Sequence, residues 1–143
     1  MMKGKHIALV VALIILLPTA VKAQPLQLQT VETDGTVYEV VEELEPFTVT
    51  TYCPCQKCNG EWTGYPAKNG EPLRAGYTVA VDPNVIPLNT WLYLEGIGIR
   101  KACDTGGKVK GQKIDLLIGD CGGMNTYENV RVWVVEGDGN GAD

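Results

Sequence analysis

Short apolar runs divided by Gly, Pro and Asn fill the sequence from Phe47 onward, and no 3.6-residue apolar period lasts long enough for a substantial helix. This punctuation is typical of an all-β domain. Closing such strands into a barrel removes their exposed edges. The sequence therefore predicts a small six-stranded closed barrel with strands at Thr48–Tyr52, Thr78–Val81, Trp91–Leu94, Ile99–Cys103, Ile114–Ile118 and Val130–Val135.

The segment before this domain has a different amino-acid composition. Residues 24–46 are Gln-rich and then acidic, which predicts a linker that could add one edge strand. The domain itself is expected over residues 47–137, followed by a flexible tail at 138–143. Trp91 and Tyr93 are expected to pack on opposite faces of the barrel wall.

The first 23 residues have the order of a secretory signal peptide. Lys3 and Lys5 precede an apolar run from Ile7 to Leu17, and Ala23 supplies a small residue for cleavage. Eleven apolar residues are too few for a bilayer-spanning helix, which needs about 20. The mature chain is therefore expected outside the cytoplasm, secreted or at the cell wall, with no stable membrane span.

Loss of this segment changes which chemistry is available. The only histidine, His6, lies within it, so Ser-His and Cys-His nucleophilic catalysis and histidine-based metal sites are excluded. The formal charge falls from -5 to -8, because three basic side chains and no acidic ones are removed. An acidic chain without a basic cluster does not favour nucleic acid as a partner.

Three aspartates stand in or beside predicted strands, where aspartate is disfavoured. Asp82 precedes Pro83 and Asp104 precedes Thr-Gly-Gly, so each is also suited to capping a turn, and for Asp82 that role is at least as well supported as catalysis. Asp115 lies between apolar neighbours, where poor solvation raises a carboxyl pKa. Asp104 is expected to lie nearby and to raise that pKa further.

The five cysteines of the mature domain leave at least one thiol unpaired if the others form disulfides. They are Cys53, Cys55, Cys58, Cys103 and Cys121. An exported chain favours structural disulfides first and free buried thiols next. A thiolate zinc site beginning at Cys55-x-x-Cys58 is favoured least, because Cys103 and Cys121 lack ligand spacing. No metal or other cofactor is expected.

The combination of motifs from about Thr48 to Val135 resembles the 3D domain, named for three aspartates. The matching stretches are Tyr52-Cys-Pro-Cys-Gln-Lys-Cys58, Thr78-Val-Ala-Val-Asp-Pro-Asn-Val-Ile-Pro-Leu88, Asp104-Thr-Gly-Gly-Lys-Val-Lys-Gly111 and Ile114-Asp-Leu116. Their order and spacing make the resemblance specific. Two stretches depart from the family pattern. Pro66–Gly70 stands where relatives commonly carry Thr or Ser with small residues, and Asp120–Gly123 stands where they often carry a Ser-His pair.

The resemblance implies a double-psi β-barrel similar to the core of MltA-type lytic transglycosylases, which cut the β-1,4 bond between N-acetylmuramic acid and N-acetylglucosamine. This barrel domain is also found in secreted muralytic proteins resembling resuscitation-promoting factors. The implied partner is a peptidoglycan glycan strand, and the chain is expected to be a monomer or weak dimer.

The family's site residues carry over to this chain by position. Asp115 takes the place of the catalytic acid, Asp104 that of the assisting carboxylate, and Asp82 that of the first aspartate. The substrate-binding residues are expected to be Tyr52, Trp62, Thr105, Gly106, Gly107 and Lys110.

Two other functions remain open from the sequence. One is a non-catalytic wall-binding or wall-loosening module, as in expansin-like barrels, because fold alone does not decide function. The other is an aspartic peptidase, suggested by Asp104-Thr-Gly, which the short spacing from Asp104 to Gly119 disfavours.

Overall fold

The computed structural model describes residues 29–137. The expected signal peptide, the start of the linker and the C-terminal tail lie outside these residues. The chain forms β1 (Thr30–Thr33), β2 (Thr36–Tyr52), α1 (Gln56–Asn59), η1 (Gly60–Trp62), β3 (Thr78–Ala80), β4 (Trp91–Leu94), β5 (Gly98–Asp104), β6 (Lys113–Leu117), η2 (Cys121–Gly123) and β7 (Thr126–Glu136). Among the described residues, no helix has the length and apolar character needed to cross a membrane.

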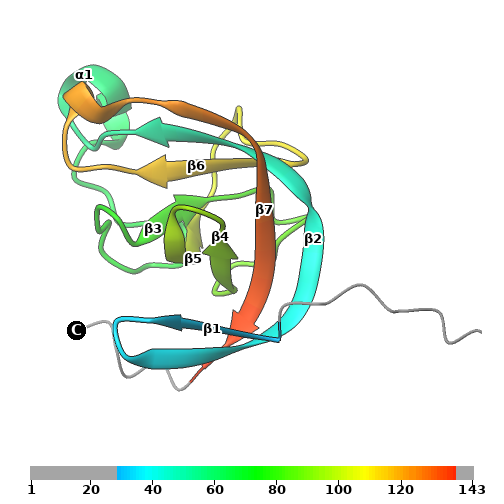
Figure 1. The fold of residues 1–143 in the computed structure, drawn as a ribbon. Coiled ribbons are helices and arrows are strands. Elements are labelled where there is room, and N and C mark those ends of the chain that lie inside the picture. Colours follow the sequence, from blue (N-terminus) through cyan, green and yellow to red (C-terminus); the bar gives the residue numbers. More distant parts are fainter. Residues whose placement is uncertain (1–28, 138–143) are drawn as a thin grey trace, which may run out of the picture.

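Six of the strands close into a barrel in the order β2-β6-β3-β5-β4-β7, and β7 returns to pair with β2 (Figure 1). The β2–β6 and β3–β5 pairs are parallel, whereas β3–β6, β4–β5, β4–β7 and β2–β7 are antiparallel. The predicted all-β fold with a six-stranded double-psi barrel is confirmed.

The barrel interior is filled by apolar side chains from every strand. The buried cluster comprises Phe47, Val49, Val79, Val81, Ile86, Leu92, Leu94, Ala102, Ile114, Leu116, Val130 and Val132. On β4, Leu92 and Leu94 are fully buried in this cluster. Side chains alternate along a strand, so Trp91 and Tyr93 share the other face. Both pack against a separate cluster with Tyr38 and Trp133, so the expectation that they point to opposite faces is wrong.

The acidic segment before the domain contributes more backbone to the sheet than an edge strand. Residues 30–33 form β1, and residues 36–46 form the first part of β2, a strand that continues through the predicted Thr48–Tyr52. Asp34 and Gly35 join β1 to β2 at positive φ, as a two-residue hairpin turn requires. Register shifts against β7 lie between Val40 and Glu42 and on both sides of Phe47, and β2 curves strongly along its length (Figure 1).

Candidate functional site

Strand pairing brings Asp104 and Asp115 to the same level of the barrel. Ala80 on β3 pairs with Asp115 on β6 and with Asp104 on β5. The two aspartates are therefore two strand spacings apart, or about 10 Å between Cα atoms. The methyl side chain of Ala80 leaves the space between them open.

These residues line one groove of about 710 Å³. Five of the six predicted substrate-binding residues line it as well: Tyr52, Trp62, Thr105, Gly106 and Gly107. Lys110 does not line the groove, so the structure gives no support to its predicted contact. A second hollow of about 670 Å³, lined by residues of the β1–β2 hairpin and Trp133, contains none of the predicted site residues.

Asp115 occupies a half-buried position at the groove. Burial is the main influence on its carboxyl group and raises its pKa, while a hydrogen bond from Thr50 and the charge of Lys113 act in the opposite direction. The Thr50 hydroxyl donates to Asp115 Oδ1 at 2.8 Å. Asp104 was expected to raise this pKa, but burial accounts for the increase and Asp104 is not among its causes.

Asp104 is held as a hydrogen-bond acceptor. The Tyr52 hydroxyl donates to its Oδ2 at 3.3 Å, and the Lys68 backbone N–H donates to its Oδ1 at 3.0 Å. Burial, followed by the charge of Asp104, raises the pKa of Tyr52, so this phenol stays protonated as a donor. The two carboxyl groups thus have different surroundings, one poorly solvated and one anchored by donors.

Asp82 belongs to a loop and does not line the groove. Its Oδ1 accepts from the backbone and side-chain nitrogens of Asn84, both at 3.1 Å, and its Oδ2 accepts from Gly111 N–H at 2.9 Å. These bonds, that from Gly111 first, lower its pKa. They agree with the turn-forming role considered for this residue and offer no contact with the groove.

Two aromatic side chains form an exposed pair on the groove wall. Trp62 and Tyr65 are 63% and 60% exposed, and their ring centroids are 6.0 Å apart in an edge-to-face arrangement. Exposed aromatic faces of this kind are suited to contact with the apolar face of a sugar ring. Trp62 is the last residue of η1, which follows α1 directly, and Tyr65 lies three residues further along the chain.

Two residues that sequence reasoning did not select complete the site. Thr50 reaches Asp115 because β2 and β6 are parallel and in register at these positions. Lys68 reaches Asp104 from the Pro66–Gly70 segment, which departs from the family pattern. No local sequence signal marks either contact, because each joins segments far apart in the chain.

The loop after Asp104 gives a matched test of the groove wall. A Cβ at Gly106 would lie 2.8 Å from Val109 Cγ2, whereas a Cβ at Gly107 would meet nothing within 4 Å. Val109 is buried, so it has little freedom to move. We expect Gly106→Ala to cost about 1–3 kcal/mol in the free energy of unfolding and Gly107→Ala far less, measured by urea denaturation. Equal effects of the two variants would contradict this packing.

All five cysteines are free thiols in the structure. Cys103 is buried beside Glu71, and burial raises its pKa to about 11. Cys53, Cys55, Cys58 and Cys121 gather at one end of the barrel, where Cys58 also lines the groove. The disulfides favoured from the sequence stay a prediction.

Comparison with known families and proteins identifies the core of the barrel. Residues 77–136 match the 3D domain model. This match, from the residue before β3 to the end of β7, confirms the resemblance predicted from the sequence. It contains Asp82, Asp104 and Asp115, whereas Tyr52, Trp62 and three of the clustered cysteines precede it.

Curated relatives come from Bacillus subtilis (strain 168). The chain is 58% identical over 40 residues to the cell wall-binding protein YocH, covering 28% of this chain and 14% of the relative. It is 44% identical over 64 residues to the putative cell wall shaping protein YabE, covering 44% and 15%. The chain thus spans about one seventh of the length of either relative.

Among solved structures, MltA from E. coli aligns with a TM-score of 0.41 and 27% sequence identity, over 50% of this chain and 27% of MltA. The structure of E. coli MltA with bound chitohexaose aligns with a TM-score of 0.42. The barrel assignment itself rests on the strand pairings described above.

Proposed function

We propose that this protein is a peptidoglycan lytic transglycosylase that cleaves the bond between N-acetylmuramic acid and N-acetylglucosamine and leaves a 1,6-anhydro product. The observation that carries the proposal is the half-buried Asp115, whose raised pKa favours a protonated carboxyl group in an open groove opposite Asp104. The 3D domain match and relatives named for cell-wall binding and shaping support a cell-wall substrate.

The proposed reaction needs only one group that exchanges a proton. Protonated Asp115 donates its proton to the glycosidic oxygen, and the bond from that oxygen to C1 of the muramic acid breaks. Positive charge develops at C1. Asp115, now a carboxylate, accepts the proton of the sugar's own 6-hydroxyl as O6 bonds to C1 and closes the anhydro ring. No water is consumed.

Asp104 has a separate role in this mechanism. Tyr52 and the Lys68 N–H fix the position of its carboxylate, which then stabilises the positive charge at C1 without moving a proton. Trp62 and Tyr65 hold neighbouring sugar rings at the groove wall. The nucleophile in these steps is the sugar's own 6-hydroxyl, so they require no histidine, enzyme nucleophile or metal.

The products distinguish this function from its alternatives. Purified peptidoglycan is incubated with the protein, and soluble muropeptides are identified by mass spectrometry. We expect 1,6-anhydro ends. Products with reducing ends would instead establish hydrolysis, and co-sedimentation without products would establish a binding module.

The binding module is the second candidate, and the exposed Trp62–Tyr65 pair is the observation that favours it, since stacking on sugars requires no acid. Under this alternative, replacing Trp62 with Ala weakens sedimentation with peptidoglycan, and no muropeptides are released by either form.

The Thr50 hydroxyl offers a test of the acid through pH. Its hydrogen bond favours the carboxylate of Asp115 and lowers the pKa, so Thr50→Val is expected to raise that pKa further. Because release requires protonated Asp115, the rate falls as pH rises through this pKa. The fall should therefore shift to higher pH in Thr50→Val and stay close to the wild-type position in Thr50→Ser, which keeps the hydroxyl. A pH–rate profile that is the same in all three forms would contradict this role of Thr50.

A further inference from the structure

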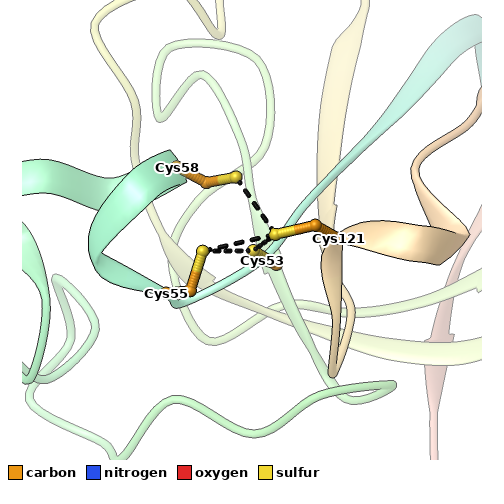
Figure 2. A group of neighbouring side chains, drawn as sticks. All are labelled: Cys53, Cys55, Cys58 and Cys121. Atoms are coloured by element: carbon orange, nitrogen blue, oxygen red, sulfur yellow. Dashed lines mark hydrogen bonds between the residues drawn. The ribbon is translucent and has the colours of Figure 1, made fainter.

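Four cysteine sulfurs converge at one point beside the groove (Figure 2). Cys121 Sγ lies 2.7 Å from Cys53 Sγ, 3.3 Å from Cys55 Sγ and 3.5 Å from Cys58 Sγ, and Cys53 and Cys55 are 3.0 Å apart. All four sulfurs lie within 4.8 Å of one another. Three come from the end of β2 and α1, and the fourth comes from η2.

The helices that carry these thiols have no apolar anchor of their own. No residue of α1, η1 or η2 is buried. Cys55 precedes α1 without a side-chain cap, and the turn is closed by local hydrogen bonds alone: the N–H groups of Cys58 and Asn59 donate to the Cys55 carbonyl, and Gln56 and Gly60 bond to each other. A crosslink or a bound metal is one means by which such short exposed turns are held in a fixed position.

We propose that Cys53, Cys55, Cys58 and Cys121 form a structural zinc site. Four thiolates bind Zn²⁺ tetrahedrally with bonds of about 2.3 Å, which places neighbouring sulfurs roughly 3.8 Å apart. The separations here, from 2.7 Å to no more than 4.8 Å, bracket that value. Soft thiolate ligands select zinc over calcium or magnesium.

A metal accounts for this arrangement better than disulfides. A disulfide joins one sulfur to one other, whereas Cys121 has three sulfur neighbours at similar distances. The zinc site also accounts for the odd number of cysteines. The fifth, Cys103, is buried beside Glu71 and lies outside the cluster. Zinc was favoured least from the sequence because Cys103 and Cys121 lack ligand spacing along the chain, whereas the fold brings Cys121 to the other three clustered cysteines.

Four protein ligands leave no open coordination position, so the metal would act on structure and not on the substrate. It would clamp residues 53–62 to the turn at 121–123. Cys58, Asn59 and Trp62 line the groove, so the clamp would fix one of its walls. The site stands independently of the proposed transglycosylase activity, since a binding module needs the same wall.

Metal content and thiol reactivity test the proposal together. The full chain is purified without chelators under anaerobic conditions, and its zinc content is measured by inductively coupled plasma mass spectrometry. We expect about one equivalent of zinc per chain. A mercurial reagent that blocks thiols should release it, as followed with a zinc-sensitive dye, and Co²⁺ exchanged into the site should give the absorption of tetrahedral thiolate coordination.

Two variants separate ligand loss from general damage. Cys58→Ser changes an exposed side chain and should abolish stoichiometric zinc binding, whereas Cys103→Ala should retain it. Zinc removal should also make the exposed Lys57 peptide bond more sensitive to trypsin. Two disulfides among the four clustered cysteines, or failure of the reduced wild-type chain to bind either Zn²⁺ or Co²⁺, would overturn the proposal whether or not muropeptides are released.

Discussion

Replacing Asp115 with Asn is expected to slow the release of 1,6-anhydro muropeptides by about 100- to 10,000-fold. The amide keeps the shape of the side chain and can still accept the hydrogen bond from Thr50, but it has no acidic proton to donate. The groove and the fold should therefore persist. Release is measured by mass spectrometry and folding by thermal unfolding of the same preparation.

Glu95→Gln is the matched control for this charge change. Glu95 is exposed, lies outside the groove and makes only a 3.7 Å ion pair with Arg131. The Glu95→Gln protein should release muropeptides at the wild-type rate. A folded Asp115→Asn protein with undiminished release would refute the assignment of Asp115 as the acid, even if 1,6-anhydro products are formed.

Phe47→Ala is expected to lower the free energy of unfolding by about 3–5 kcal/mol. Phe47 is only 2% exposed and lies within the barrel cluster, where β2 pairs with β7. Removing its ring leaves a cavity that the surrounding strands cannot close. Because a domain of this size is stable by only about 5–15 kcal/mol, the variant should unfold at a much lower urea concentration.

Val41→Ala provides the comparison within the same strand. Val41 is 55% exposed, so truncation should change the free energy of unfolding by no more than about 0.5 kcal/mol. Similar midpoints for the Phe47 and Val41 variants in urea would show that Phe47 does not pack in the core as described.

The barrel strands were predictable because each has a local apolar pattern. Trp91–Leu94 matches β4 in full, and Ile114–Ile118 is shifted by one residue from β6. The first part of β2 was expected only as a linker that could add one edge strand, because its glutamates and Pro46 obscure the strand pattern. In the fold these charges face solvent, and Glu43 forms an ion pair with Arg131 on β7 at 2.9 Å.

The site was predictable in its residue types but not in its contacts. The apolar residues on both sides of Asp115 in the sequence correctly indicated that its carboxyl group is poorly solvated. Its relation to Asp104 depends on β3 lying between β5 and β6, and its bond from Thr50 depends on a parallel register. The meeting of Cys121 with Cys58 has the same origin. Contacts between distant segments leave no local trace in a sequence.

The return of β7 to β2 has a consequence for how the chain acquires its structure. The same strand, β2, needs both β6 and β7 as neighbours, and its partners in β7 extend to Glu136. Ring closure must therefore wait until almost the whole domain has been synthesised, and such long-range pairing is slow. A chain that ends before β7 would leave one edge of β2 and one edge of β4 without a partner, and unpaired strand edges favour aggregation.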